Sequence, residues 1–366
     1  MKKIVFITWA LEVGGAERFL VKLVQNIPQD RYSIQVVCVT RKGVWAEELE
    51  TRGINVISMD KRVGIDIGVL FRLVYYLKKE KPDIVNTSIW TADLWGRMAA
   101  ILAGVRHIIV TEQNVDIWKR WYHKIIDQIL FKWTDYVLCV SDDVATFYHD
   151  NFGIPYSKLR MIPNAVDLDL FDKCITNSNF HVSLGINEKD FIFVCPARLH
   201  PQKAHHILIQ AVYELFLNGH RGFKVLLIGE GERKQELQQL VVAKGLEEIV
   251  LFLGLRQDVP DILLQADAFV LSSDYEGLSL AVLEGMAARL PIIATRVGGN
   301  AQLVENGVSG YLVPPQDFLA FSNAMLMVLQ DKNKAEAMGI NGRSLVEKKY
   351  QIKIVASQVL KLFEEL

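Results

Sequence analysis

The chain has 366 residues, of which 51% are hydrophobic, 23% charged and 10% aromatic. This length exceeds what one hydrophobic core of ordinary size holds, so we expect two domains, and the composition excludes a disordered chain. The formal net charge of −1 provides no overall field that would attract nucleic acid, and we expect no nucleic-acid partner.

Neither the cysteines nor the amino-terminal segment indicates export. Cys38, Cys139, Cys174 and Cys195 lie far apart without metal-ligand spacing, and we expect reduced, structural thiols. The apolar stretch Ile4–Ala10 leads directly into a glycine loop, which is typical of a first strand and not of a signal peptide. No stretch reaches the roughly 18 apolar residues of a membrane-spanning helix. We therefore expect a cytoplasmic protein.

Short β-branched stretches alternate with longer helical patterns along the whole chain, and this rhythm predicts parallel sheets. The predicted strands of the first half are Ile4–Thr8, Ile34–Thr40, Ile54–Ser58, Asp83–Thr87, Ile108–Thr111 and Tyr136–Ser141. Those of the second half are Phe191–Pro196, Phe223–Gly229, Ile249–Leu253, Ala268–Ser272, Pro291–Thr295 and Tyr311–Val313. The predicted fold is α/β, with two Rossmann-like, doubly wound sheets that face a central cleft.

We place the first domain at residues 1–168 and the second at residues 180–348. Between them, the turn formers of Arg160–Asp167 and the polar residues Asn177–Asn179 indicate a hinge. Residues 350–366 form a last helix, and the sequence leaves open whether it packs on the second domain or back on the first. Because ligands of open α/β sheets bind at the carboxyl ends of the strands, we look for function in the loops there.

The first of these loops carries Gly14 and Gly15 and leads from a strand into a helix. Paired glycines at a helix N-terminus let backbone amides approach an anion, which the helix dipole also attracts. The alternative is a tight turn that needs glycine for its dihedral angles. The loop alone does not decide between the two.

The first strand of the second half is followed by Arg198 and Lys203. Two cations at this spacing can straddle a diphosphate and neutralise the charge that develops on it as a leaving group. The alternative is an ordinary solvated basic loop.

The stretch Ser272–Ala288 combines a strand end, a loop with Glu276 and a helix that is apolar on every side except at Glu284. Such a helix is predicted to be buried, and its carboxylate then needs a partner from outside the helix. A ribose diol and an arginine are the two candidates. Glu276 can accept hydrogen bonds from sugar hydroxyls, and the amides of Gly277, Leu278, Ser279 and Leu280 can face an anion.

Taken together, these elements resemble the retaining glycosyltransferases of family 4, which have the two-domain GT-B fold and are frequent in bacterial polysaccharide and glycan assembly. The matching residues are Gly14–Arg18, the Arg198 and Lys203 pair, the Glu276 and Glu284 pair, and Gly298–Asn300 with the glycines behind it. They span nearly the whole chain in the expected order.

The resemblance implies a donor site for a nucleotide diphosphate sugar, with a UDP-sugar as the expected donor. Arg198 and Lys203 would bind the diphosphate, Glu284 the ribose, and Glu276 the transferred sugar; Glu276, Arg198 and Lys203 are the expected catalytic residues. Gly14 or Gly15 would line the phosphate side, and the stretch with Gly254 and Arg256 would meet the base. The resemblance further implies transfer with retention, without a cofactor and without a metal ion.

On the acceptor side the sequence departs from the family. The histidine that is often present after the fourth or fifth strand is absent from Asn86–Trp90 and from Thr111–Asn114. Glu112, Gln113 and Asn114 are the substitute candidates for ordering the acceptor hydroxyl. Further departures are Ala204, Ala165 and Gln302, at positions where the family usually has two glycines and an acidic residue.

The stretch Asp116–Ile126 combines aromatic and basic residues, which we interpret as one helical segment. Such a mixture, here in Trp118–Lys124, suits a helix at a membrane interface, so we expect a saccharide or lipid-linked acceptor and peripheral contact with the inner face of the cell membrane. The alternative is an ordinary amphipathic helix with its aromatic side chains in the core.

Three other functions compete with transfer. A sugar-nucleotide epimerase or hydrolase would use the same donor contacts without an acceptor, and a non-catalytic partner subunit would only bind the nucleotide sugar. A nicotinamide dehydrogenase is disfavoured because the first loop lacks the three-glycine fingerprint.

Overall fold

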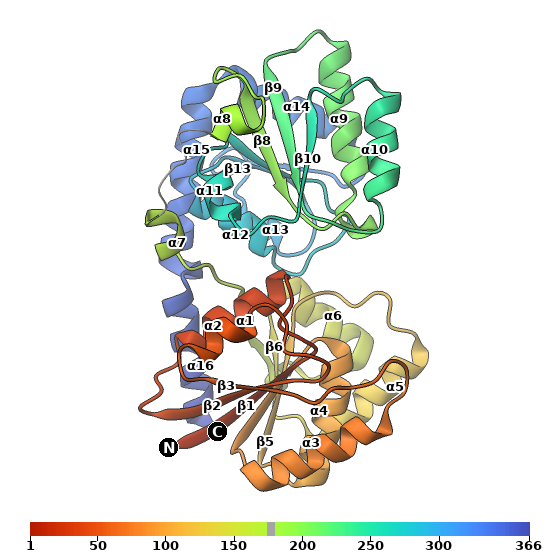
Figure 1. Cartoon of the computed structure of the whole chain (residues 1–366), viewed down its shortest axis with the longest axis vertical. Helices are drawn as coiled ribbons and strands as arrows, with labels where there is room; N and C mark the ends of the chain where they lie inside the picture. Colours follow the sequence, from red (N-terminus) through yellow and green to blue (C-terminus); the bar gives the residue numbers. More distant parts are fainter. Residues whose placement is uncertain (174–179) are drawn as a thin grey trace. The chain divides into compact units, whose positions relative to one another are not determined.

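The computed structural model describes residues 1–173 and 180–366 (Figure 1). It divides into two compact units, one formed by Met1–Ala165 with Ile352–Leu366 and the other by Val166–Gln351. The predicted hinge residues Asn177–Asn179 and Cys174 lie outside the described residues. No helix in the described ranges is long and apolar enough to cross a membrane.

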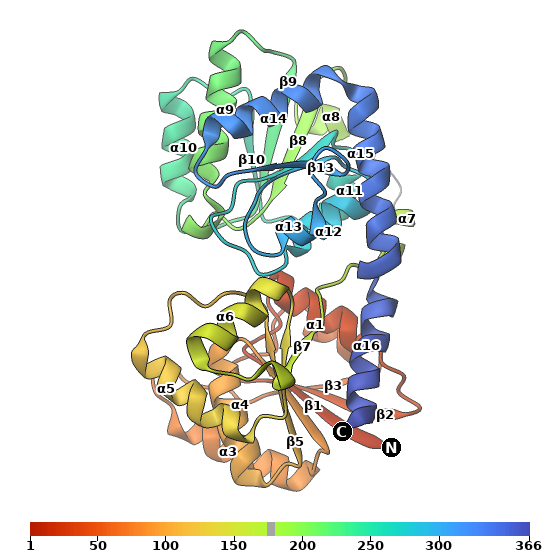
Figure 2. The same cartoon turned by 180° about the vertical axis from the view of Figure 1, so that it is seen from behind.

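The first unit is built on a seven-stranded parallel sheet with the order β3-β2-β1-β4-β5-β6-β7. Its strands are β1 (Lys2–Thr8), β2 (Tyr32–Cys38), β3 (Asn55–Ser58), β4 (Ile84–Ser88), β5 (His107–Glu112), β6 (Tyr136–Cys139) and β7 (Leu159–Met161). Its α-helices are α1 (Gly15–Gln25), α2 (Ala46–Glu50), α3 (Ile67–Glu80), α4 (Trp90–Ala103), α5 (Trp121–Leu130), α6 (Asp142–Phe152) and α16 (Ile352–Glu365). Helices α3, α4 and α5 pack side by side, and α16 packs against α1 (Figure 2).

The core of this unit follows from its sequence periodicity. Helix α3 buries Val69, Leu73 and Leu77, which recur every four residues and therefore lie on one helix face. They pack against the buried strand residues Val5 and Ile7 of β1. A β-strand segment buried on both faces is expected to be apolar, as Ile4–Ile7 of β1 is.

The last helix, α16, is held to the first unit by contacts with two residues of β1. Lys2 Nζ donates a hydrogen bond of 2.8 Å to the carbonyl oxygen of Phe363, and the rings of Phe6 and Phe363 lie 6.3 Å apart. Of the two arrangements that the sequence left open, the structure has α16 on the first unit.

The second unit has a six-stranded parallel sheet with the order β10-β9-β8-β11-β12-β13. Its strands are β8 (Phe191–Pro196), β9 (Phe223–Ile228), β10 (Val250–Gly254), β11 (Ala268–Leu271), β12 (Ile292–Thr295) and β13 (Gly310–Val313). Its α-helices are α7 (Asp169–Asp172), α8 (Phe180–Ser183), α9 (His205–Leu217), α10 (Lys234–Ala243), α11 (Val259–Leu263), α12 (Leu280–Ala287), α13 (Asn300–Leu303), α14 (Phe318–Gln330) and α15 (Lys332–Leu345). Helices α10, α9 and α14 pack in one group and α11, α12 and α15 in another.

The predicted fold class is confirmed: both units are doubly wound parallel α/β sheets, and each predicted strand is present within a few residues of its expected bounds. Cys38, Cys139 and Cys195 are free and buried in β2, β6 and β8, in agreement with structural thiols. Burial raises the pKa of the Cys195 thiol to about 12, so this thiol is not reactive at neutral pH.

Candidate functional site

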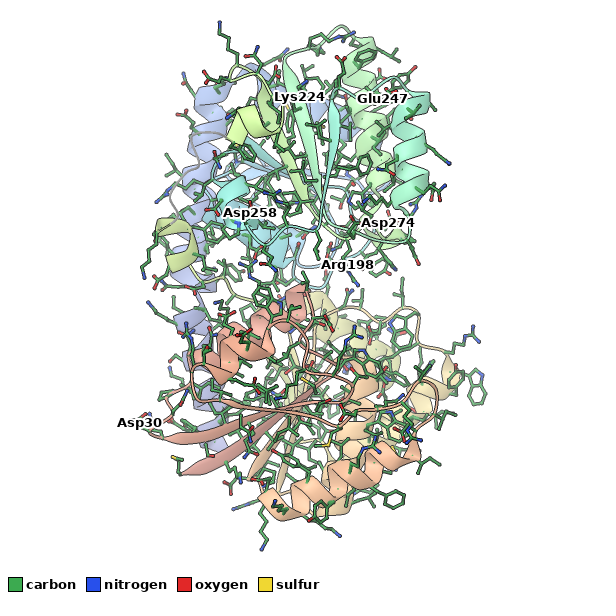
Figure 3. All side chains as sticks on the ribbon, viewed as in Figure 1. Asp30, Arg198, Lys224, Glu247, Asp258 and Asp274 are labelled. Carbon is green, nitrogen blue, oxygen red and sulfur yellow. The ribbon has the colours of Figure 1, made fainter. Side chains whose placement is uncertain are left out.

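The strand order of the second unit marks a site between β8 and β11. The chain continues from β8 outward through β9 to β10, and from β11 outward through β12 to β13. Such a reversal separates the loops that leave the two central strands, and ligands of open α/β sheets bind there. In Figure 3, Arg198 and Asp274, which follow β8 and β11, lie at one end of this unit, whereas Lys224 and Glu247 lie at the other.

Hydrogen bonds join the loop after β8 to the loop after β11. The amide of Asp274 donates to the carbonyl oxygen of Gln202 at 2.8 Å, and Gln202 Nε2 donates to the carbonyl oxygen of Tyr275 at 2.8 Å. Ser272 Oγ donates to the carbonyl oxygen of Lys203 at 3.0 Å. Because these bonds involve mainly backbone atoms, they fix the position of both loops.

This arrangement brings Lys203 and Glu276 together. Lys203 Nζ lies 2.5 Å from Glu276 Oε1, and Ser273 Oγ donates to the same oxygen at 2.6 Å. Glu276 is buried and Lys203 is partly buried, so their charges interact with little screening by solvent. The pair can bind the polar groups of a ligand that displaces one partner from the other.

Two glycines of the loop after β12 lie against the backbone of Glu276 and Gly277. Gly298 has a φ of +48°, and a Cβ atom there would lie 1.9 Å from the carbonyl oxygen of Glu276. The amide of Gly299 donates to the carbonyl oxygen of Gly277 at 2.7 Å. Only glycine permits this approach of backbone to backbone, which explains the glycine pair.

Arg198 is exposed, and its guanidinium makes no hydrogen bond or ion pair to the other described residues. The chain turns sharply between Arg198 and α9, through a 3-10 turn at Pro201–Lys203 and Ala204 with a φ of +44°. His205 begins α9 and is buried, and burial together with Lys203 and Arg233 lowers its pKa to about 3. His205 is therefore neutral at physiological pH.

Helix α12 follows the loop with Glu276 and is capped by Ser279, whose side chain accepts a hydrogen bond from the amide of Val282 at 3.3 Å. A Cβ atom at Gly285 would lie 2.7 Å from the ring of Phe269, so the glycine lets α12 lie close on β11. The predicted burial of α12 holds for most of its residues, whereas Glu284 is half-buried. A half-buried carboxylate can still bind a ligand.

The loop after β9 belongs to the same edge of the sheet but was missed by sequence reasoning. Gly229 has a φ of +146°, and a Cβ atom there would lie 2.3 Å from the carbonyl oxygen of Ala197. Gly231 approaches the carbonyl oxygen of Leu199 equally closely. The sequence feature that could have identified this loop is the pair Gly229 and Gly231 at the end of a predicted strand.

The loop after β10 contains Gly254 and Arg256. Gly254 has a φ of +67°, and its carbonyl oxygen accepts the amide of Gly229 at 2.8 Å, so this loop joins the one after β9. The guanidinium of Arg256 forms two hydrogen bonds with Asp258, of 2.7 and 2.5 Å. Arg256 is thus oriented by a neighbouring carboxylate.

In the first unit, Gly14 is the N-cap of α1 with a φ of −167°, and Gly15 begins the helix. This φ is extended backbone, which any residue can adopt, so the alternative that the loop needs glycine for its dihedral angles is wrong for Gly14. A Cβ atom there would instead lie 2.2 Å from the Glu17 carboxylate. Gly15 is exposed at the N-terminus of α1.

The candidates Glu112, Gln113 and Asn114 follow each other at the carboxyl end of β5. Gln113 and Asn114 are half-buried, whereas Glu112 is buried. Burial raises the pKa of Glu112 to about 8, and the nearby cation Lys119 only partly opposes this effect. The carboxyl of Glu112 is therefore largely protonated at neutral pH and acts as a neutral group.

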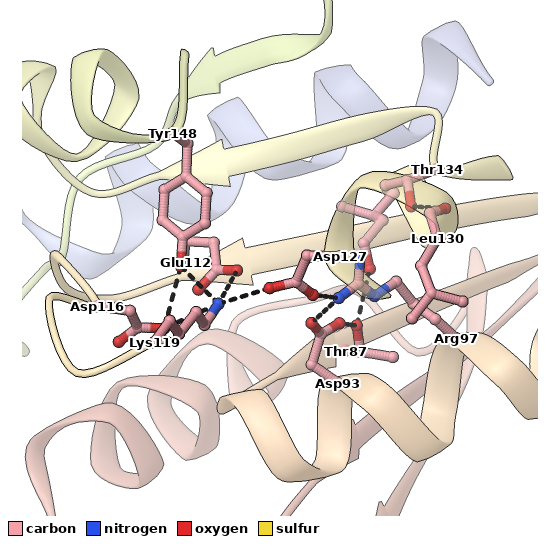
Figure 4. A network of polar contacts seen from close by, with 11 residues as sticks. Thr87, Asp93, Arg97, Glu112, Asp116, Lys119, Asp127, Leu130, Thr134 and Tyr148 are labelled. Carbon is pink, nitrogen blue, oxygen red and sulfur yellow. Dashed lines mark hydrogen bonds and ion pairs between the residues drawn. The ribbon is translucent and has the colours of Figure 1, made fainter. Parts of the chain in front are cut away.

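Glu112 belongs to a buried polar network (Figure 4). Lys119 Nζ lies 3.0 Å from a carboxylate oxygen of Asp116 and 3.0 Å from one of Asp127, and Arg97 binds the other oxygen of Asp127 at 2.5 Å. Burial lowers the pKa of Lys119, but the surrounding carboxylates outweigh this effect and raise it above the usual value. The network thus holds charged lysine and arginine side chains inside the unit.

The network corrects two predictions for the stretch Asp116–Ile126. The helix α5 begins only at Trp121, since Arg120 is its N-cap with an extended backbone. Lys119 does not face solvent or a membrane, because its side chain is 0% exposed. The sequence pattern concealed the burial of Lys119 because two of its partners, Asp127 and Tyr148, lie outside this stretch.

Comparisons with known proteins agree with this fold. Residues 13–170 match the family model described as Glycosyltransferase Family 4, and residues 176–345 match Glycosyl transferases group 1. The crystal structure of Anabaena Alr3699/HepE in complex with UDP-glucose superimposes with a TM-score of 0.87 over 100% of both chains, at 23% identity. This chain belongs to the GT-B glycosyltransferases.

Two curated relatives match this GT-B glycosyltransferase over most of their length. It is 29% identical to the Escherichia coli UDP-Gal:alpha-D-GlcNAc-diphosphoundecaprenol alpha-1,3-galactosyltransferase, over 87% of this chain and 86% of the relative. It is 26% identical to the Bacillus anthracis N-acetyl-alpha-D-glucosaminyl L-malate synthase, over 83% and 80%. The protein is a glycosyltransferase that acts on nucleotide sugars.

Proposed function

We propose that this glycosyltransferase transfers a hexose from a UDP-sugar to a saccharide that is linked through diphosphate to a polyprenol, with retention of the anomeric configuration. The observation that carries the proposal is the ion pair of Lys203 and Glu276 at the carboxyl ends of β8 and β11. The proposal is supported because a cation beside a hydrogen-bond acceptor is the combination that a sugar diphosphate needs.

In the proposed reaction, the bond between C1 of the donor sugar and the diphosphate oxygen breaks, and UDP leaves with the electron pair. Lys203 and Arg198 neutralise the negative charge that develops on the diphosphate, while Glu276 accepts hydrogen bonds from the sugar hydroxyls. The acceptor oxygen forms the new bond on the same face of C1. Its proton passes to the departing diphosphate, so no enzymic nucleophile and no metal ion take part.

The choice of substrates is supported by the relatives. The Escherichia coli relative is named for UDP-Gal as its donor and GlcNAc-diphosphoundecaprenol as its acceptor. The Anabaena structures with the same fold contain UDP and UDP-glucose. Glu284, half-buried on α12, is the proposed partner of the ribose, and the loop with Gly254 and Arg256 the proposed contact of the base.

The test is transfer of sugar from UDP-galactose and UDP-glucose to a synthetic N-acetylglucosamine diphosphate with a short lipid, followed by NMR of the product. We expect the new linkage to have the anomeric configuration of the donor, and excess EDTA to leave the rate within about twofold. An inverted product, a trapped covalent glycosyl-enzyme or loss of activity in EDTA would contradict the corresponding part of the proposal. Accumulation of an isomerised UDP-sugar without acceptor would instead identify an epimerase.

We further propose that the first unit contacts the membrane that carries such an acceptor. Helices α3 and α5 each expose a row of apolar side chains at every fourth residue, with Trp121 73% and Phe71 69% exposed. The rows are Ile67, Phe71 and Tyr75 on α3 and Trp121, Ile125 and Ile129 on α5. Helices with such rows and adjacent cations suit a membrane surface. The cations available on the α5 side are Arg120 and Lys124, since Lys119 is buried.

Sedimentation with vesicles of anionic phospholipid tests this contact. We expect Trp121→Ser combined with Ile125→Ser to abolish sedimentation at low salt, and neutralisation of Arg120 and Lys124 to weaken it. Exposed apolar residues of the second unit, such as Leu217, provide the matched control, and Leu217→Ser should sediment like the wild type. Equal sedimentation of all variants would contradict the contact.

A further inference from the structure

Three aromatic side chains of the first unit form a cluster that the proposed reaction does not use. The rings of Trp90 and Trp118 meet edge to face with centroids 5.5 Å apart, and the ring of His123 lies 4.6 Å from Trp90 and 5.3 Å from Trp118. Trp118 is 50% exposed. Trp118 thus presents part of its ring to solvent while it contacts two further rings.

The cluster lies at the end of the sheet where ligands of this fold bind. Trp90 begins α4 two residues after β4, and Trp118 belongs to the loop that follows β5. Strands β4 and β5 are parallel neighbours, so their carboxyl ends lie at the same edge. His123 Nδ1 accepts the amide of Arg120 at 3.0 Å, so Nε2 carries the proton of a neutral ring and can donate to a ligand.

The backbone before Trp90 is strained. Ile89 has a φ of +69° and a ψ of 118°, a conformation that is a genuine outlier for a β-branched residue. Such strain costs about 1–3 kcal/mol, persists only where the surrounding structure enforces it, and is frequent at functional sites. Trp90 Nε1 is in addition hidden from solvent without an acceptor among the described residues. Fold stability alone therefore does not account for the position of this ring.

The loop that carries Trp118 is anchored from inside the unit by its neighbour Lys119 (Figure 4). Lys119 Nζ lies 3.0 Å from Asp127 of α5 and 3.1 Å from Tyr148 Oη of α6. A buried ion pair gives little or no more stability than apolar side chains of similar volume would. What it provides is one fixed position of the loop, and with it a fixed position of the exposed Trp118.

We infer that Trp118, supported by Trp90 and His123, is the stacking surface for a pyranose ring of the acceptor saccharide. A pyranose presents one face of C–H groups, which pack on an aromatic ring, and a rim of hydroxyls, which need polar partners. His123 Nε2 and the half-buried Gln113 of the same loop provide such partners. This inference rests on the proposed function, because it assigns a saccharide to the acceptor.

Binding can be measured without turnover by saturation-transfer NMR on the full chain, with methyl glycosides of the common hexoses and N-acetylhexosamines and with saturating UDP present. We expect transfer to the C–H protons of one glycoside in the wild type, about tenfold weaker binding in Trp118→Leu, and an intermediate loss in Trp118→Phe. Trp133→Leu is the matched control, since Trp133 is 54% exposed and lies outside the cluster. Absence of any signal in the wild type, or an equal signal in Trp118→Leu and Trp133→Leu, would overturn the inference.

Kinetics with the lipid-linked acceptor then separate stacking from the other roles of this surface. Stacking predicts a KM for the acceptor about tenfold higher in Trp118→Leu, with kcat and UDP affinity within about threefold of the wild type. If instead Trp118→Leu loses vesicle sedimentation and leaves the glycoside signals unchanged, Trp118 is a membrane contact and the inference is wrong. If no sugar is transferred by any variant while glycoside binding still depends on Trp118, the proposed function fails and the saccharide site stands.

Discussion

Lys203 and Glu276 are separated by 73 positions in the sequence, yet their charged groups lie 2.5 Å apart where β8 and β11 end. The parallel neighbours β8 and β11 bring the two loops together, and backbone hydrogen bonds through Gln202 hold them there. The contact between Lys203 and Glu276 thus depends on the order of the strands in the sheet.

The ion pair is expected to be coupled energetically. Lys203→Met leaves the Glu276 carboxylate buried without its cation and should lower the free energy of unfolding by about 2–4 kcal/mol, whereas Glu276→Gln should cost less because Ser273 can still donate to the amide oxygen. In the double variant the two losses should not add. Additive losses in denaturant unfolding would show that the two side chains do not interact in solution.

Gly298→Ala should displace the loop that carries Glu276. The new methyl group would meet the carbonyl oxygen of Glu276, and the φ of +48° already disfavours alanine. We expect a loss of about 2–4 kcal/mol in stability and weaker UDP binding by calorimetry. Gly307→Ala is the control, since its φ of +82° is similar but no atom lies within 4 Å of the added carbon. It should cost about 1 kcal/mol and leave UDP binding intact.

Lys119→Met should be among the most destabilising changes of a charged residue in the first unit. It removes the cation that lies among Glu112, Asp116 and Asp127, so we expect a loss of about 3–5 kcal/mol in urea unfolding. Lys132→Met, at an exposed position nearby, should change stability by at most about 0.5 kcal/mol. Similar losses in the two variants would contradict the buried position of Lys119.

Glu112 should give the first unit a dependence on pH. Its folded-state pKa of about 8 is higher than that of the unfolded chain, so the folded state retains a proton that the unfolded state has lost. The contribution of the Glu112 proton to the free energy of unfolding is fully present at pH 4. It is lost as the pH rises to 8, by up to about 1.4 kcal/mol per pH unit. The glutamine of Glu112→Gln does not titrate. The melting temperature of this variant should therefore rise relative to that of the wild type as the pH increases from 5 to 8. Parallel pH profiles would show that Glu112 is ionised throughout this range.

Most of the fold was predictable from local patterns, because parallel strands buried on both faces are short, apolar and regularly spaced. Residues whose partners are distant in sequence were predicted less well. The pattern around Lys119 suggested a surface helix, and only the placement of Asp127 and Tyr148 shows that this lysine is buried. The strained backbone at Ile89 left no signal in the sequence either.

The sequence predicted candidate donor residues in the loops after β8, β10 and β11, but it did not predict how these loops contact one another. That Lys203 contacts Glu276 depends on the sheet order, which strand patterns do not provide. The glycines at 229 and 231 were visible as a pair at a strand end, whereas their contacts with the loop after β8 required the fold. The binding roles of all the candidate donor residues, Lys203 and Glu276 included, stay predictions.

The central claim is that the loops after β8 and β11 bind the donor, and calorimetry with UDP, GDP and ADP sugars tests it most directly. We predict that the wild type binds UDP-sugars, that Lys203→Ala and Glu284→Ala bind them at least about tenfold more weakly, and that Lys224→Ala and Glu247→Ala, at the opposite end of the same unit, bind like the wild type (Figure 3). Binding that is unaffected in Lys203→Ala and Glu284→Ala, or no nucleotide binding at all, would contradict the claim.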